Sequence, residues 1–275
     1  MNQRQKIQQR KLRAVKPSKQ AEVYYRKQML SLVDLMQSLV VNELQNDALN
    51  DALFSRGVEL LARQMDRALS KLEALDINSI ALMMARGFVN RLNRNNDNTF
   101  KANLRNNVGL DLKGSIEAEG LTDALKVIVS QNVALIKSVK DEYKENIGKL
   151  LRDNVLEGNR PTNLVTQIKD IGGVTKSRAK LIARTETAKI NTDMTQLRSE
   201  ALGAKTYVWS ASMDERTRAS HAVLDGLTMR FDDDTVYSDD GGLTWKPRSK
   251  IGGEQIKPGK IWNCRCAMLP IISFS

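Results

Sequence analysis

The stretch LTDALKVIVSQNVALIKSVKDEYKENIGKLL, residues 121–151, decides the fold class of this 275-residue chain. Its apolar residues recur at the three- and four-residue spacing of one helix face. They are Leu125, Ile128, Ile136, Val139, Tyr143, Ile147 and Leu150. The stretch therefore predicts a long helix with one buried face. EGNRPTN at 157–163 should end it, because Gly158 and Pro161 do not continue a helix.

Three more stripes with helical spacing precede this stretch, in residues 18–42, 54–72 and 80–92. We interpret them as contacts between packed helices. The asparagine-rich segment 90–107 predicts a connection, because asparagine favours caps and turns over helix interiors. Methionine adapts to irregular contacts, so we also expect one methionine face to lie partly at an interface with a partner molecule. Its members are Met29, Met36, Met65, Met83 and Met84.

A pair of glycines, Gly172 and Gly173, predicts a turn after the helical body. Thr175 is the expected N-cap of a helix that runs to about Glu200, and Gly203 should stop it. A glycine turn before a basic helix is also typical of helix-hairpin-helix DNA binding, in which backbone amides hold a phosphate. We favour the plain turn.

Residues after Gly203 are rich in β-formers. The expected strands lie in KTYVWSAS, GLTMRF, DDDTVYSDDGGLTWKP and IWNCRCAMLPI, and DERTRASHAVLDG suits a short helix. The expected fold class is mainly α, a helical N-terminal body with a small C-terminal α+β module. We expect three parts: a basic flexible arm at 1–20, a helical body at 21–160, and a module at 161–275.

The net charge of +11 is concentrated near the start of the chain, where residues 1–20 contain seven basic residues and no acidic one. Such an arm should seek nucleic acid or an acidic partner surface. Its basic residues are Arg4, Lys6, Arg10, Lys11, Arg13, Lys16 and Lys19. No apolar run approaches the roughly 20 residues of a membrane span, and two cysteines make no disulfide framework. We expect a protein made in the cytoplasm that does not enter a membrane.

Cys264, Cys266 and the single histidine, His221, form the candidate metal site. With Asp225 or Asp214 they would supply a tetrahedral zinc ion with sulfur, nitrogen and oxygen ligands. The alternative is that the cysteines pack as small apolar residues while His221 hydrogen-bonds a carboxylate. A metal-dependent hydrolase centred on His221 is a further candidate, although no recognised nucleophile or glycine loop completes an active site.

Charged residues near His221 suggest a structural role. Asp214 and Arg218 are four positions apart, and Arg216 lies between them. We expect a buried ion-pair lattice that joins this segment to Arg184 and Glu186 of the preceding helix.

Four motifs in order carry a resemblance to a known family: ARTETAKINT, YVWSASMDERTRASHAVLDG, a proline-bearing loop, and PGKIWNCRC. From about Gly172 to Cys266 the chain resembles the phage Mu F-like minor head proteins. The resemblance implies a non-enzymatic virion component at the portal vertex of the head, synthesised in the host cytoplasm, that assists head assembly and genome packaging or delivery. The implied partners are the portal protein, the major capsid or scaffolding protein, and double-stranded genomic DNA, which the basic arm would contact along with the portal.

Two other functions remain open from the residues. The first is a non-specific DNA-binding protein of the virion interior, which the basic arm favours. The second is the metal-dependent hydrolase centred on His221. Zinc is the candidate cofactor.

Overall fold

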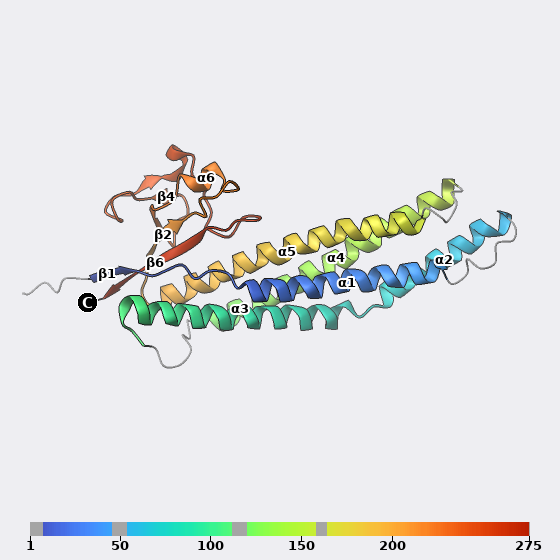
Figure 1. The fold of residues 1–275 in the computed structure, drawn as a ribbon, viewed down its shortest axis with the longest axis horizontal. Coiled ribbons are helices and arrows are strands. Elements are labelled where there is room, and N and C mark those ends of the chain that lie inside the picture. Colours follow the sequence, from blue (N-terminus) through green and yellow to red (C-terminus); the bar gives the residue numbers. More distant parts are fainter. Residues whose placement is uncertain (1–7, 46–53, 112–119, 158–163, 275) are drawn as a thin grey trace, which may run out of the picture. The chain divides into compact units, whose positions relative to one another are not determined.

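The computed structural model describes residues 8–45, 54–111, 120–157 and 164–274. Long helices dominate it, and short strands follow them near the C-terminal end (Figure 1). The helices are α1 (Lys19–Gln45), α2 (Phe54–Ala74), α3 (Ile77–Val108), α4 (Leu121–Glu157), α5 (Leu164–Ala201) and α6 (Ala219–Ala222). The strands are β1 (Gln8–Lys11), β2 (Thr206–Ser210), β3 (Thr228–Arg230), β4 (Val236–Tyr237), β5 (Lys246–Pro247) and β6 (Ala267–Phe274). The expected mainly α fold with a small C-terminal β-containing module is confirmed.

Two compact units divide the chain, and they are interleaved in sequence. One unit comprises Met1–Glu22, Phe88–Ile128 and Arg184–Ser275, and the other comprises Val23–Gly87 and Val129–Ala183. These units differ from the consecutive parts that we expected, because α1, α3, α4 and α5 each contribute to both. None of the described helices contains a stretch that is long and apolar enough to cross a membrane.

The described residues of the unit 23–87 and 129–183 lie almost entirely in helices with buried apolar faces. Glu43 of α1 pairs with Lys71 of α2, and Arg178 of α5 pairs with Glu142 of α4. Our prediction that the methionine face lies at an interface is mostly wrong. Met29, Met36, Met65 and Met84 are buried in the core, and of the five only Met83 is exposed. Flexible methionines fill gaps between helices here, in a unit with few aromatic residues.

Gly172 and Gly173 lie inside the continuous helix α5, so the expected turn, the N-cap at Thr175 and the helix-hairpin-helix alternative are wrong. A Cβ atom at Gly172 would clash with the side-chain amide of Gln37 on α1. Thr175 instead donates from its hydroxyl to the carbonyl of Ile171, one turn earlier in the helix. Helix α5 therefore runs through Gly172 without a break, with the Gln37 side chain packed against it.

The asparagine-rich segment also differs from expectation, because residues 90–107 continue helix α3 to Val108. Asn96 is fully buried and donates to Asn191 Oδ1 at 3.0 Å and to Thr195 Oγ1 at 2.9 Å, both on α5. Asn191 in turn donates to the backbone carbonyl of Val15 at 2.6 Å. Tertiary hydrogen bonds therefore override the weak helix propensity of asparagine.

Arg198 of α5 completes this buried polar network. Its guanidinium donates to Asn96 Oδ1 and to Asn93 Oδ1, both at 2.6 Å, and its Nε lies 3.5 Å from Asp97 Oδ1. The side chain is only 2% exposed. The network thus joins α3, α5 and the segment after β1, which are far apart in sequence.

Strand β6 organises the sheet, whose order is β1-β6-β2-β3 with antiparallel neighbours. On one side Lys11 of β1 pairs with Ile271, and on the other Trp209 of β2 pairs with Met268. Strands β4 and β5 form a separate two-stranded ribbon. The strands expected after Gly203 and the short helix in 214–226 are therefore present.

Residues 8–20, which we expected to belong to a flexible arm, are instead packed against the rest of the protein. Their period-two pattern exposes Lys11 and Arg13 but buries Leu12, and Val15 is also buried. The backbone N–H of Leu12 donates to the carbonyl of Pro270 at 2.8 Å, which extends the pairing of β1 with β6. Apolar residues between the basic ones anchor the segment. Residues 1–7 lie outside the described part of the chain.

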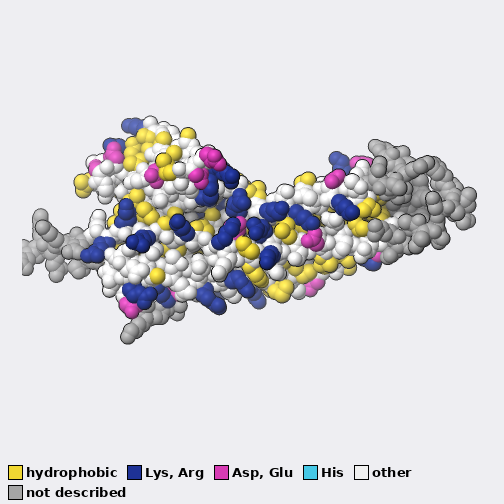
Figure 2. Space-filling model, viewed as in Figure 1, with side chains coloured by type: hydrophobic (Ala, Val, Ile, Leu, Met, Phe, Trp, Pro, Cys, Tyr) yellow, Lys and Arg dark blue, Asp and Glu magenta, His cyan; other side chains and the backbone are white. Residues whose placement is uncertain are grey.

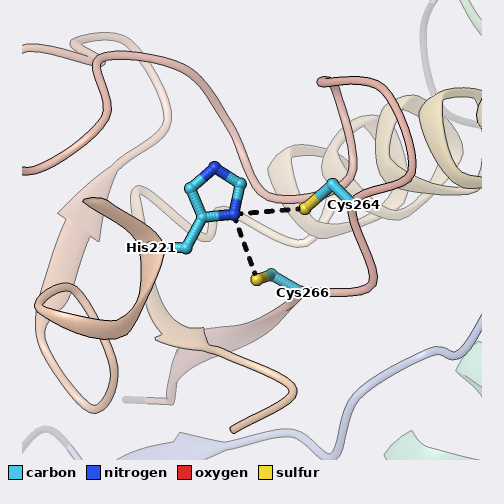
Figure 3. A group of neighbouring side chains, drawn as sticks. All are labelled: His221, Cys264 and Cys266. Carbon is cyan, nitrogen blue, oxygen red and sulfur yellow. Dashed lines mark hydrogen bonds between the residues drawn. The ribbon is translucent and has the colours of Figure 1, made fainter. Parts of the chain in front are cut away.

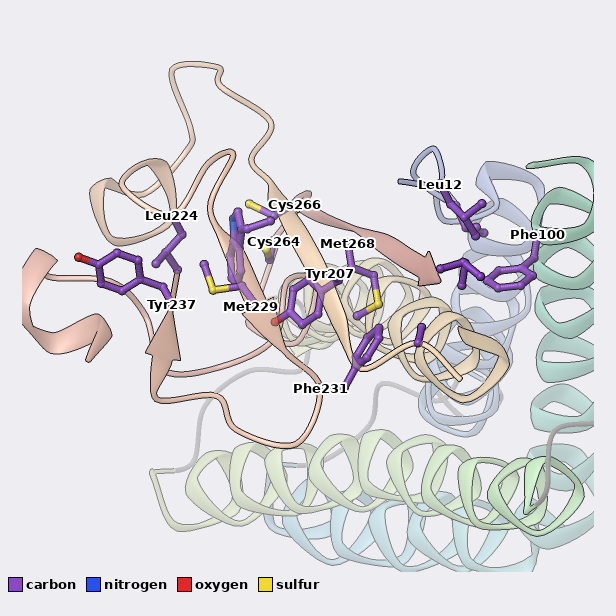
Figure 4. Close-up of a cluster of buried hydrophobic side chains, with 14 of the residues drawn as sticks. Leu12, Phe100, Tyr207, Leu224, Met229, Phe231, Tyr237, Cys264, Cys266 and Met268 are labelled. Carbon is purple, nitrogen blue, oxygen red and sulfur yellow. The ribbon is translucent and has the colours of Figure 1, made fainter. Parts of the chain in front are cut away.

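An apolar cluster of described residues lies in the unit that contains the sheet (Figure 4). Leu12, Phe100 of α3, Tyr207 of β2 and Met268 of β6 belong to it. The same cluster includes Cys264 and Cys266, so these two candidate metal ligands belong to a core built by the segment after β1, by α3 and by the strands β2, β3, β4 and β6.

Replacing Arg198 with leucine should lower the free energy of unfolding by about 3–5 kcal/mol, because the oxygens of Asn93, Asn96 and Asp97 lose their buried partner. Chemical denaturation measures the change. The matched control is Arg230→Leu, which removes an arginine from the solvent-exposed pair with Asp232. Comparable losses in the two variants would contradict the importance of the buried network.

Leu12→Ala should lower the free energy of unfolding by about 2–4 kcal/mol, since it removes a fully buried side chain from the core. Lys11→Ala changes the neighbouring exposed residue and should have little effect. Hydrogen exchange of the β6 amides provides a second readout. If Leu12→Ala matches Lys11→Ala in both measurements, β1 is not part of the stable sheet.

Candidate metal centre

His221 reaches the core from a single-turn helix. The chain leaves β2, forms a turn in which Thr217 N–H donates to the Asp214 carbonyl at 2.9 Å, and then enters α6. The His221 side chain is buried, with 2% exposure, and its ring meets the Trp209 ring edge-on with centroids 5.5 Å apart. Packing against β2 therefore fixes the orientation of the imidazole.

The Cys-X-Cys spacing follows from extended backbone that leads into β6. Burial alternates from residue 264 to residue 272, so Cys264 and Cys266 point inward while Arg265 is exposed. In extended backbone, residues two positions apart lie on the same face. Asn263, with φ at 57°, adopts the left-handed conformation that asparagine tolerates, and the extended run starts directly after it. One intervening residue is therefore the spacing that places two sulfur atoms on one side.

The three side chains converge on one point (Figure 3). His221 Nδ1 lies 3.5 Å from Cys264 Sγ and 3.5 Å from Cys266 Sγ, and the three ligand atoms all lie within 4.8 Å of one another. Both cysteines are free thiols and are buried, with 5% and 6% exposure. The other ring nitrogen, Nε2, is buried and has no hydrogen-bond partner among the described residues.

Hydrogen bonding separates the acidities of the two thiols. The bond that Cys266 donates, together with those from His221 and the Gly259 N–H, lowers the pKa of Cys264 to about 4 against the effect of burial. The same bond, burial and the charge of Cys264 raise the pKa of Cys266.

Helix α5 holds the loop before Cys264. Thr192 donates from its hydroxyl to the Pro258 carbonyl at 2.7 Å, and Asp193 pairs with Lys260. Gly259 has φ at 83°, and its N–H donates to Cys264 Sγ at 3.3 Å. A Cβ atom there would lie 2.6 Å from Thr192 Oγ1, so only glycine allows this approach.

The outer face of the site is fixed by Arg265, which sequence reasoning missed. Its guanidinium contacts both carboxylate oxygens of Asp214 at 2.6 Å. The pair joins the loop before α6 to the segment before β6, the two segments that supply His221 and the cysteines. The sequence held one signal that could have identified Arg265, namely its position between the two cysteines. In extended backbone successive side chains point to opposite sides, so Arg265 points away from the sulfur atoms.

Asp225 does not join the cluster, although we expected it as a metal ligand. Its carboxylate accepts a hydrogen bond from the Ala211 backbone N–H at 2.8 Å. Asp214 is likewise engaged elsewhere, with Arg265. Among the described residues, the group that could hold a metal ion consists of His221, Cys264 and Cys266.

The ion-pair lattice that we expected is replaced by other contacts. Arg218 donates to the Trp262 carbonyl at 2.9 Å, and Arg184 donates to Asn263 Oδ1 at 3.5 Å. Glu186 pairs with Lys189 of its own helix. Arg216 is exposed and lies near Glu215. Residues 214–218 are not helical, so Asp214 and Arg218 do not meet.

The basic residues proposed for DNA or portal contact fall into two groups. Arg4 and Lys6 lie outside the described residues. The others are exposed on an ordered segment, and they are Arg10, Lys11, Arg13, Lys16 and Lys19. They remain candidates for contact with a partner.

Comparison with known proteins places the site inside a family match. Residues 145–269 match the family model described as phage Mu protein F like protein. An uncharacterized protein of Haemophilus influenzae is 32% identical over 273 residues, which are 98% of this chain and 57% of that protein. The minor head protein GP7 of Bacillus phage SPP1 is 27% identical over 152 residues, which are 54% of this chain and 44% of that protein. The chain thus spans about half the length of these relatives. No solved structure matches it significantly.

Gly259→Ala should destabilise the protein and loosen Cys264, because the new methyl group meets Thr192 Oγ1 and the backbone must leave its left-handed conformation. The control is Gly241→Ala, at φ 76° with open space around it, which should cost only about 1–2 kcal/mol for the backbone conformation. Thermal unfolding compares the two variants. An equal loss would show that close packing at Gly259 does not matter.

Proposed function

Residues 145–269 belong to the phage Mu protein F-like family, and on this premise we propose that the chain is a minor structural protein of a phage head. In this proposal it sits at the portal vertex of the virion and assists head assembly and genome packaging or delivery. Its direct partner is the portal protein, with the major capsid or scaffolding protein as a neighbour.

The observation that carries the proposal is the family match together with the similarity to a minor head protein of phage SPP1. The matched range contains the ARTETAKINT motif on α5 and the PGKIWNCRC motif before β6. Thr192, the last residue of the first motif, donates to Pro258 of the second motif, so these two motifs are in contact. This supports a shared module rather than a chance similarity of short segments.

Surface charge supports a location next to acidic surfaces or nucleic acid. The chain carries a net charge of +11, and Figure 2 shows Lys and Arg side chains spread along the visible face. Such a surface is attracted to polyanions, including packaged DNA and acidic protein surfaces.

The second candidate function is non-specific DNA binding inside the virion. The observation that favours it is the run of exposed basic side chains near β1, which includes Lys11, Arg13 and Lys16. Binding through phosphate contacts weakens steeply as salt rises, whereas docking through apolar contacts does not. Salt dependence therefore separates the two functions.

The test uses heads assembled in cells that make this chain with the portal, major capsid and scaffolding proteins. We expect purified heads to retain the chain in a few copies after nuclease treatment and at high salt. Leaving out the portal protein should remove the chain from the heads. Quantitative mass spectrometry measures the ratio of chain to capsid protein.

The variant Lys11→Gln/Arg13→Gln/Lys16→Gln distinguishes the DNA-binding alternative. It should enter heads as well as the wild type if portal docking places the chain there. Loss of the variant from heads, or release of the wild-type chain by nuclease, would favour DNA binding. Equal incorporation with and without the portal protein would reject docking at the portal vertex.

A further inference from the structure

We propose that His221, Cys264 and Cys266 bind one zinc ion, through Nδ1 of the imidazole and the Sγ atoms of the two cysteines. The ion would cross-link the α6 segment to the start of β6. This inference does not rest on the proposed role in the phage head.

Interatomic distances support a shared tetrahedral ion. Zinc binds histidine nitrogen at about 2.0–2.1 Å and cysteine sulfur at about 2.3 Å, so a tetrahedral angle separates the two ligand atoms by about 3.6 Å. Nδ1 lies 3.5 Å from each sulfur atom. Both nitrogen–sulfur separations therefore match those of zinc ligands, and the two sulfur atoms lie within 4.8 Å of each other.

Hydrogen bonds to Cys264 do not explain why Nδ1 lies equally close to both sulfur atoms. A ring nitrogen has either one lone pair or one hydrogen, so Nδ1 can serve one of two sulfur atoms that lie equally close to it. A divalent cation, in contrast, accepts an electron pair from all three atoms at once. It also neutralises the charge of two thiolates, which would otherwise repel each other in a buried site.

The surroundings favour thiolates and hold the ligands in place. The Gly259 N–H donates to Cys264 Sγ, a contact that stabilises negative charge on sulfur. The Arg265–Asp214 pair fixes the two ligand-bearing segments from outside. Contacts of this kind beyond the ligands orient them and tune the ion.

The burial of the site points to a structural role. His221, Cys264 and Cys266 are at most 6% exposed, and no carboxylate among the described residues belongs to the group. Structural zinc sites usually have four protein ligands, so the structural role rests on the burial of this site; we assign the fourth position to a water molecule. The ion would stabilise the fold by joining residue 221 to residues 264–266. Cys264 and Cys266 belong to the core of the unit that contains the sheet.

The direct test is the zinc content of the purified full-length chain, after dialysis against metal-free buffer. We expect about one zinc per chain in the wild type and less than a tenth of that in Cys264→Ser/Cys266→Ser. The control Met268→Leu changes a buried neighbour of similar volume that cannot bind zinc, and it should keep the ion. A chelator should lower the melting temperature of the wild type and of Met268→Leu.

Cobalt substitution keeps the test valid if the double variant fails to fold. Adding Co²⁺ to chelator-treated wild-type protein should produce thiolate-to-cobalt charge-transfer absorption and the strong visible bands of a tetrahedral ion, saturating at one equivalent. The proposal is overturned if the folded wild type contains no zinc, shows no such absorption and does not respond to a chelator. Zinc that the folded double variant retains would equally reject these residues as ligands.

Discussion

The pairing of β6 with both β1 and β2 is the constraint on which the sheet-containing unit depends. Because β6 lies between them, one register fixes the positions of both neighbours. A shift of one residue would turn every side chain of the strand to the opposite face. Met268 and Ile272 would leave the core, and if the shift extended upstream the two sulfur atoms would turn away from His221. The register of one strand therefore sets both the core and the candidate metal site.

The helices and strands were largely predictable because their apolar periodicity is local information. The errors arose where distant residues decide the structure. Gly172 suggested a turn, but it accommodates Gln37 of another helix. The asparagines of α3 suggested a connection, but Asn96 binds α5 through a network that includes Arg198. Leu12 was overlooked among basic residues, since its partner strand is at the other end of the chain.

The candidate site was predictable in its residues but not in its surroundings. A single histidine and two neighbouring cysteines are distinctive in any sequence, and the alternation of extended backbone explains how they converge. Asp225 was a wrong choice, because a carboxylate one turn from His221 in an expected helix could not be distinguished from one that caps a loop at Ala211. The roles of Arg265 and Gly259 depend on the exact path of the backbone. Composition and residue spacing do not specify that path, so these roles could not be predicted from the sequence.

The position of β6 also determines the order in which the protein can fold during synthesis. Lys11 pairs with Ile271, so roughly 260 residues are translated after β1 before its partner strand exists. At about 5–20 residues per second, β1 waits unpaired for some 13–50 seconds. During this time the helices can form from local contacts, whereas the sheet and the cysteine cluster cannot. The nascent chain therefore carries an open strand edge for most of its translation, and a ribosome-associated chaperone that shields residues 8–15 would improve its yield.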